Sequence, residues 1–159
     1  MPEAPGRDLI LRLARADDLP AMAGLLGAVI AEGDKTAFDG PMTPARIDAL
    51  FLSGPDCLGC LVALQSGRLL GFQGLDAKYM PGTGWADISS FVLAEARGVG
   101  VGTALWQAMQ PAARHRGLIG LRAVIRAVNT GAQAYYRRCG FAPLQTMCPL
   151  PCRLTCRGA

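Results

Sequence analysis

The sequence predicts an α/β fold in which helices cover the faces of a mixed β-sheet. The chain has 159 residues, of which 51% are hydrophobic and 18% charged, so it holds enough apolar material for one buried core. Strand-like and helix-like segments follow one another in the order β-α-α-β-β-β-α-β-α-β. Proline and glycine fall at short turns, without a long linker. We therefore expect one domain over residues 1–159.

The first elements are a strand and a helix. Residues 9–13 alternate weakly, as in a strand. From Leu19 to about Ala31 apolar residues recur at helical spacing, and Asp17 or Asp18 is placed to cap this helix. The face that we expect to be buried carries Leu19, Met22, Leu25, Leu26 and Val29.

A polar loop, a short helix and three strands come next. Residues 32–43 are polar and turn-rich, and we expect them to form a wall of a substrate site. Pro44 opens a short helix over Ala45 to Leu52. The strands that follow are Cys60 to Leu64 and Leu69 to Leu75, joined by a turn at 65–68, and then Trp85 to Leu93.

The last third of the chain predicts two helices and three strands. A helix from about Gly100 to Arg116 ends at Gly117, and we expect Pro111 to kink or shorten it. In the extended segment 118–128, Arg122 and Arg126 fall on one face. The remaining elements are a helix over Thr130 to Cys139, capped by Asn129 and ended by Gly140, and two last strands over Phe141 to Met147 and Arg153 to Cys156.

Charge is distributed unevenly along the chain. Residues 1–95 carry a net charge of −5, whereas residues 96–159 carry nine arginines and no acidic residue. This asymmetry favours an anionic ligand for the C-terminal part. The basic residues are not interleaved with aromatic residues, so we expect a phosphorylated cofactor and no nucleic acid.

Several classes of protein lack their signatures here. His115 is the single histidine, which excludes a two-histidine metalloprotease helix, and neither a P-loop nor a Gly-x-Ser-x-Gly turn is present. Cys57 and Cys60 have zinc-like spacing without a second such pair, so we expect no metal. The N-terminus lacks a secretory signal and residues 19–31 are too short to span a bilayer, so we expect a cytoplasmic protein without a membrane partner.

The segment 94–103 is a glycine-rich turn between a strand and a helix. Such a turn favours phosphate, because glycines expose backbone N–H groups at the positive end of the helix dipole. The dinucleotide pattern fails, since Thr103 stands where its third glycine belongs. Taken alone, the turn fits a phosphate site and a ligand-free connection equally well.

Two motifs together resemble one family. Arg97-x-x-Gly100-x-Gly102 follows a strand that ends Phe91-Val92-Leu93, and about 27 residues later comes Asn129-x-x-Ala132-x-x-Tyr135-Tyr136-x-x-x-Gly140-Phe141. Both resemble the cofactor motifs of the GNAT superfamily of acyl-CoA-dependent N-acetyltransferases. The resemblance implies a mixed, mostly antiparallel sheet that splays between its fourth and fifth strands and holds acetyl-CoA, a co-substrate, in the opening. Residues 35–41 also resemble acceptor loops of phosphinothricin and amino-acid acetyltransferases.

The same resemblance implies the residues that contact the co-substrate. The backbone at the glycine-rich turn would bind the pyrophosphate, with the Thr103 hydroxyl beside it. The end of the preceding strand would pair with the pantetheine arm like an added strand. Asn129 would contact the arm or orient the loop. The implied set is Phe91, Val92, Leu93, Arg97, Gly98, Val99, Gly100, Val101, Gly102, Thr103, Asn129 and Tyr136.

Three catalytic roles are implied for acyl transfer to an amine. The Val92 N–H would stabilise the oxyanion, and Tyr136 would donate a proton to the leaving sulfur, whereas Tyr135 would be a packing residue. Asp87 would receive the amine proton directly or through water, and its alternative role is a capping or surface charge.

The resemblance implies an N-acetyltransferase that acts on the primary amine of a small, amino-acid-like molecule in a ternary complex. Two alternatives stay open: a protein N-terminus, lysine or aminoacyl-tRNA as acceptor, and a CoA-binding module without turnover. A monomer and a homodimer also both stay open.

Overall fold

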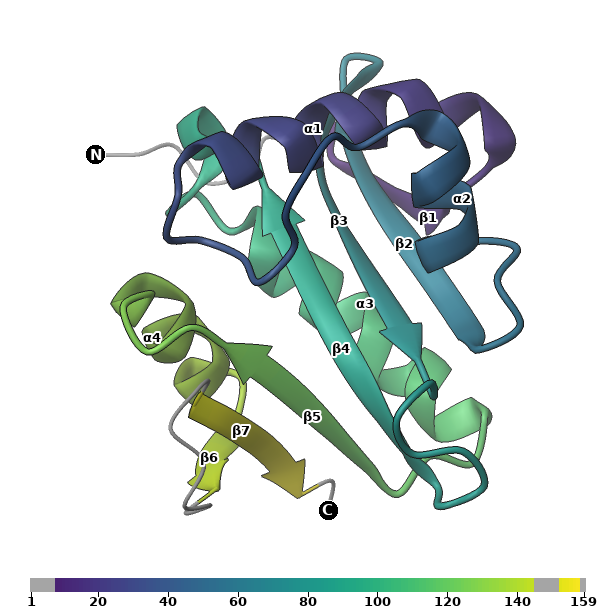
Figure 1. Ribbon diagram of the computed structural model, residues 1–159, viewed down its shortest axis with the longest axis vertical. Helices are drawn as coiled ribbons and strands as arrows, with labels where there is room; N and C mark the ends of the chain where they lie inside the picture. The colour runs from purple at the N-terminus through teal and green to yellow at the C-terminus, as the bar shows by residue number, and fades with distance from the viewer. Residues whose placement is uncertain (1–7, 145–151, 158–159) are drawn as a thin grey trace.

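The computed structural model describes residues 8–144 and 152–157. In this part of the chain seven strands form one sheet in the order β1-β2-β3-β4-β5-β7-β6 (Figure 1). β4 and β5 pair in parallel and all other neighbouring strands are antiparallel, which confirms the predicted mixed sheet. The strands are β1 (Ile10–Leu13), β2 (Cys57–Gln65), β3 (Arg68–Asp76), β4 (Trp85–Val92), β5 (Gly120–Ile125), β6 (Phe141–Leu144) and β7 (Cys152–Arg157).

Helices cover both faces of the sheet, as predicted. Figure 1 shows α1 and α2 on one side and α3 on the other, with α4 beside β5. Two short 3-10 turns, η1 (Ala16–Asp18) and η2 (Ala94–Ala96), have no counterpart among the predicted elements. The last predicted strand pair exists: β7 extends one residue beyond each end of the predicted 153–156, and of the predicted 141–147 the structure describes 141–144, since residues 145–151 lie outside the described chain. The helices are α1 (Leu19–Ala31), α2 (Pro44–Phe51), α3 (Val101–His115) and α4 (Thr130–Arg138).

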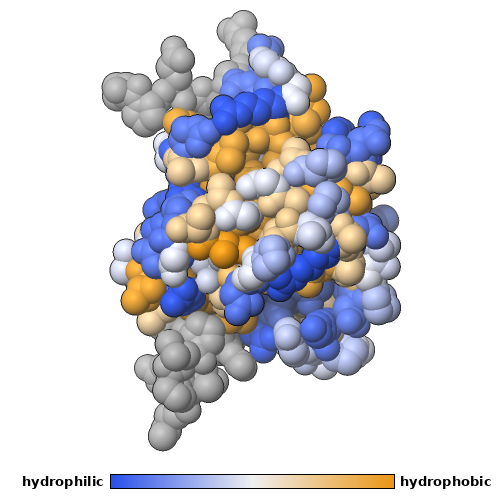
Figure 2. Space-filling view, turned by 45° about the horizontal axis from the view of Figure 1, so that its top comes forward, coloured by the Kyte–Doolittle hydropathy of each residue, from blue (hydrophilic) through white to orange (hydrophobic). Residues whose placement is uncertain are grey.

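The core lies on both faces of the sheet. Under α1 and α2, Met22, Leu26 and Ile47 pack against Phe72 and Phe91 of β3 and β4. The predicted apolar face of α1 is thereby confirmed. On the surface, hydrophobic residues are interspersed with hydrophilic ones, as Figure 2 shows for one side of the molecule.

The opposite core joins the two halves of the sheet. Trp106 and Met109 of α3 pack against Ile88 of β4 and Leu121 of β5. Phe141 lies edge-on to the Trp106 indole, with 5.3 Å between ring centroids. This cluster holds α3, which follows the glycine-rich turn, against the strands that border the opening.

Two of the predicted helix ends differ in detail from the structure. Asp18 is at the N-cap of α1, but its carboxylate accepts hydrogen bonds from the Arg12 guanidinium (2.7 and 2.8 Å) and from the Arg15 amide, not from helix amides. The predicted side-chain cap is therefore wrong. The helix α3 continues past Pro111 to His115, so the proline does not end it.

β4 and β5 form the predicted splay. Their pairing covers three residues on each strand, from Trp85 opposite Gly120 to Asp87 opposite Arg122. Beyond these pairs the strands diverge toward their carboxyl ends (Figure 1). At the closed end the Trp85 ring lies over Gly120, where an added Cβ would be 2.5 Å from ring carbons. A side chain at this position would push apart the strands that set the opening.

Candidate active site

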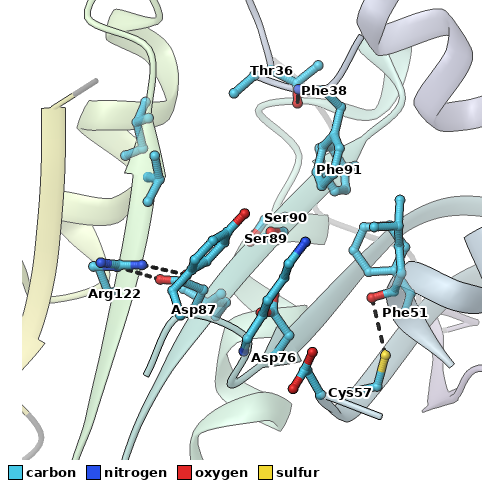
Figure 3. Close-up of a pocket in the computed structure, with 18 of the residues that line it drawn as sticks. Thr36, Phe38, Phe51, Cys57, Asp76, Asp87, Ser89, Ser90, Phe91 and Arg122 are labelled. Carbon is cyan, nitrogen blue, oxygen red and sulfur yellow. Dashed lines mark hydrogen bonds and ion pairs between the residues drawn. The ribbon is translucent and has the colours of Figure 1, made fainter. Parts of the chain in front are cut away.

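A cavity of about 830 Å³ opens where β4 and β5 diverge. Its walls come from both halves of the sheet and from the loop after α1, and Figure 3 shows part of this lining. Residues 35–38 of the loop that was expected to form a substrate wall line this cavity. The other lining residues lie within 49–51, 54–57, 76–79, 87–91, 122–126 and 129–136.

Aromatic rings form the apolar side of the cavity. Phe38 lies 6.0 Å from both Phe51 and Phe91, measured between ring centroids, and approaches Phe51 edge-on. The loop that carries Phe38 is tied to the far side of the opening, since Asn129 Nδ2 donates to the Lys35 carbonyl (3.0 Å) and Arg126 Nη1 to the Gly33 carbonyl (2.6 Å). The loop is thus fixed to the β5–α4 junction.

Asn129 performs two structural tasks. Its Oδ1 accepts a hydrogen bond from the Ala132 N–H (3.1 Å), which confirms the predicted cap of α4. Its Nδ2 bonds to the loop, so one buried side chain orders both the helix end and the cavity wall. The implied roles of Asn129 toward the pantetheine arm and the loop stay predictions.

Two carboxylates face each other across β3 and β4. Asp87 forms a two-pronged ion pair with Arg122 of β5, with 2.6 and 2.7 Å between nitrogen and oxygen (Figure 3). Asp76 is opposite Asp87 in the strand register and lines the same cavity. Burial raises the pKa of Asp76, and no ion pair to it exists among the described residues. Sequence reasoning missed Asp76, although an acid at the end of an apolar strand was a usable signal.

Tyr136 reaches the cavity from α4. It is buried, and its hydroxyl is 2.7 Å from the Ser90 hydroxyl on β4. Burial raises the pKa of the Tyr136 phenol, and the hydrogen bond with Ser90 opposes this shift. The neighbouring Tyr135 hydroxyl donates instead to the Gly102 carbonyl (2.7 Å), so its role in the free protein is structural.

The glycine-rich turn has the geometry of an anion site. Gly98 and Gly100 have φ of +76° and +94°, the left-handed region that favours glycine, and Gly100 is the N-cap of α3. This end of α3 has neither a side-chain cap nor an acid in its first turn. The first helical bond is from the Ala104 N–H to the Gly100 carbonyl, so the amides of the first turn point outward unpaired. The exposed Thr103 stands among them.

The Arg97 side chain and amide are both engaged. Its guanidinium pairs with Glu32 at 2.6 and 2.7 Å, and its Nε donates to the Val92 carbonyl (3.1 Å). The Arg97 N–H donates to the Ala94 carbonyl (3.3 Å). The amides that remain for phosphate therefore belong to the residues after Arg97, from Gly98 onward.

The edge of β4 that borders the opening is set by strand alternation. The Leu93 N–H donates to the Leu70 carbonyl of β3 (2.9 Å). Successive residues of a strand direct their backbone groups to opposite sides, so Phe91 also faces β3, whereas Ser90 and Val92 face the opening. In this arrangement the backbone groups of Phe91 and the Leu93 N–H are directed to β3, away from the opening, whereas the Val92 N–H faces the opening, the side that the implied oxyanion role needs.

The two cysteines with zinc-like spacing lie on β2, where Cys57 is opposite Asp76 in the strand register and lines the same cavity. Cys57 Sγ is 3.2 Å from the Leu50 carbonyl at the cavity wall, and burial raises the pKa of the Cys60 thiol to about 12. Among the side chains of residues 8–143 no three histidine, cysteine or acidic groups are placed so that they could hold a metal ion. None of the described helices is long and apolar enough to cross a bilayer.

Comparisons with known proteins agree with this geometry. A family model described as "Acetyltransferase (GNAT) family" matches residues 29–141, more than half of the chain. No curated protein sequence matches. A GCN5-related N-acetyltransferase from Kribbella flavida is 25% identical, with a TM-score of 0.78, over 93% of this chain and 96% of that one.

Two further solved structures share the fold. A protein assigned as a phosphinothricin N-acetyltransferase is 24% identical, with a TM-score of 0.76, over 94% of this chain and 98% of that one. YncA of Salmonella typhimurium, solved with its cofactor acetyl-CoA, is 18% identical, with a TM-score of 0.77, over 94% and 93% of the two chains.

Proposed function

Because the chain belongs to the GNAT family of acetyltransferases, we propose that it transfers the acetyl group of acetyl-CoA to the primary amine of a small, amino-acid-like molecule. The observation that carries this proposal is the cavity at the splay, which adjoins the free edge of β4 and holds Tyr136 and two carboxylates. The reaction proceeds in a ternary complex, without an acyl-enzyme.

The residues present fit acetyl-CoA. The unpaired amides at the start of α3 and the two glycines with positive φ suit a pyrophosphate, because no side chain stands between the anion and the backbone. The backbone groups of Ser90 and Val92 face the opening, where an extended pantetheine arm adds as a strand. The Val92 carbonyl already accepts from Arg97, so its N–H is the group of Val92 that remains for the ligand.

Each chemical step has a group on this chain. Acetyl-CoA supplies the acetyl group as a thioester with a thiolate as leaving group. The Val92 N–H stabilises the negative charge that develops on the carbonyl oxygen. Asp87, oriented by Arg122, receives the amine proton directly or through water, with Asp76 beside it. Tyr136 gives its hydroxyl proton to the sulfur.

The cavity favours a small zwitterionic acceptor. Its volume lies within the range of small-molecule sites, about 300–1,000 Å³. Asp76 has no cationic partner among the described residues and suits an ammonium group. Lys35, whose ammonium is 3.7 Å from Asp34, and Arg126, which uses Nη1 for the Gly33 carbonyl, also line the cavity, and their remaining N–H groups suit a carboxylate.

The test is a thiol-release assay with acetyl-CoA and matched acceptors. We expect turnover with free amino acids, a large rise in KM when the acceptor carboxylate is converted to an amide, and less turnover with peptides. Turnover restricted to peptide N-termini or lysine side chains would contradict the small-molecule proposal. If the protein binds acetyl-CoA but turns over no amine, the result would support the alternative function, a CoA-binding module without turnover.

A further inference from the structure

A chain of hydrogen bonds runs from the cavity through the sheet to the start of α3. The Tyr136 and Ser90 hydroxyls are 2.7 Å apart, and Gln73 Nε2 on β3 donates to the Ser90 oxygen at 2.7 Å. The same Nε2 lies 3.3 Å from the Tyr135 hydroxyl, which donates to the Gly102 carbonyl. Four elements, β3, β4, α4 and α3, contribute to this chain.

The donor directions in this chain are constrained. The Gln73 Nε2 group can only donate, so the Ser90 oxygen accepts from it. The hydrogen bond between the two hydroxyls can run in either direction, and the bond from Gln73 to the Ser90 oxygen favours the one in which Ser90 donates to the Tyr136 oxygen. When Ser90 donates to Tyr136, the hydrogen of Tyr136 is free to point into the cavity.

Gln73 is in an unfavourable place for an amide. It is fully buried, and its Oε1 has no hydrogen-bond partner among the described residues. An unpaired buried acceptor destabilises a fold. A methionine of similar shape would avoid that penalty, and Ser90, Tyr135 and Tyr136 would each keep another hydrogen bond. Packing therefore gives no reason for an amide here.

We propose that Gln73, acting through Ser90, is a positioning residue that directs the Tyr136 hydroxyl hydrogen into the cavity, toward the leaving sulfur. This inference rests on the proposed function. In the reaction the amine nitrogen forms a bond to the acetyl carbon and the carbon–sulfur bond breaks. The amine proton goes to the carboxylate side of the cavity, and the sulfur receives the Tyr136 proton, which solvent later replaces. As charge develops on the phenol oxygen, Ser90 donates to it and Gln73 supports Ser90.

The test compares Gln73→Met and Ser90→Ala with the parent, with Gln110→Met on the surface of α3 as control. We expect both variants to lower kcat by about tenfold, with the acetyl-CoA KM within about twofold and Ser90→Thr restoring most of kcat. The melting temperature of free Gln73→Met should equal or exceed that of the parent, since the unpaired acceptor is gone. In a Tyr136→Phe background neither substitution should lower kcat further.

The outcomes separate this inference from the proposed function. An inactive parent, or a Tyr136→Phe variant with an unchanged rate, refutes the assigned chemistry and the inference with it. An active parent with a slow Tyr136→Phe variant, combined with an unchanged kcat in Ser90→Ala, refutes the inference alone. A kcat loss that persists in the Tyr136→Phe background, or a lowered melting temperature of Gln73→Met, shows a structural role and also overturns the inference. If Gln73→Met does not fold, the comparison of Ser90→Ala with Ser90→Thr, and of Ser90→Ala with its double variant in the Tyr136→Phe background, still tests the inference.

Discussion

Replacing Thr103 with glutamate should change protein stability and co-substrate affinity in opposite directions. Thr103 is exposed in the first turn of α3, which has neither a side-chain cap nor an acid. A new carboxylate there interacts favourably with the helix dipole and the unpaired amides, by about 0.3–1 kcal/mol. For a chain of this length that corresponds to a rise in melting temperature of about 1–3 °C.

The same carboxylate should repel the pyrophosphate of acetyl-CoA. Two unit charges about 7 Å apart repel by about 1 kcal/mol at an effective dielectric constant of about 40. Two phosphate charges thus cost about 2 kcal/mol, which is a loss of about 30-fold in affinity. The loss of acetyl-CoA affinity should be smaller at high salt, because salt screens charges at the protein surface.

Calorimetric unfolding of the free protein and titration with acetyl-CoA measure the two effects. Thr103→Gln is the matched control, because it removes the hydroxyl and keeps similar size without charge. Gln107→Glu, one turn further along α3 and also exposed, tests whether distance from the turn matters. Equal acetyl-CoA affinities for Thr103→Glu and Thr103→Gln, with the expected stabilisation present, would refute the placement of the pyrophosphate at this helix end.

Three further outcomes are expected. Tyr136→Phe should slow single-turnover acetyl transfer by about 100-fold with little change in acetyl-CoA affinity, whereas Tyr135→Phe should change the rate by no more than a few-fold. Asp76→Asn should weaken acceptor turnover yet raise the melting temperature at pH 7. Burial raises the folded-state pKa of Asp76, so the charged carboxylate destabilises the fold as pH rises. The rise in melting temperature should therefore vanish below about pH 4, where the carboxyl is protonated in both states. Glu32→Gln should lower the free energy of unfolding by less than about 1 kcal/mol at pH 7, because the hydrogen bond from Arg97 lowers the pKa of Glu32. Melting curves should show the difference from the parent disappearing as pH falls through that lowered pKa.

Features encoded by neighbouring residues could be predicted from the sequence. Asn129 caps α4 because its side chain reaches the Ala132 amide three residues on, and such a contact depends only on local spacing. The splay and the place of Tyr136 came from two motifs whose order is specific to one family. Asp18 shows the limit of local reasoning, since Arg12 of β1 competes for the carboxylate that the helix amides were expected to bind.

Contacts between distant strands could not be predicted in this way. The Gln73–Ser90 bond depends on the register of β3 against β4, and a shift of one residue would place the two side chains on opposite faces of the sheet. The available signal was a polar residue inside each of two apolar strands. That signal predicts that each polar group is buried, but it does not identify the group to which it is hydrogen-bonded.

Two arginines of the basic C-terminal part, Arg122 and Arg126, link the two sides of the opening. The arginines of the C-terminal part were expected to bind an anion, yet Arg122 of β5 pairs with Asp87 of β4, and Arg126 binds the carbonyl of Gly33 in the loop after α1. Arg97 likewise pairs with Glu32 at the end of α1, which fixes the glycine-rich turn against that helix. Because β4 and β5 pair over three residues on each strand, these side-chain bonds and the packing of α3 against both strands support the opening beyond the ladder. The anion site is then left to backbone amides at the start of α3, where a phosphate can bind without breaking any of these links.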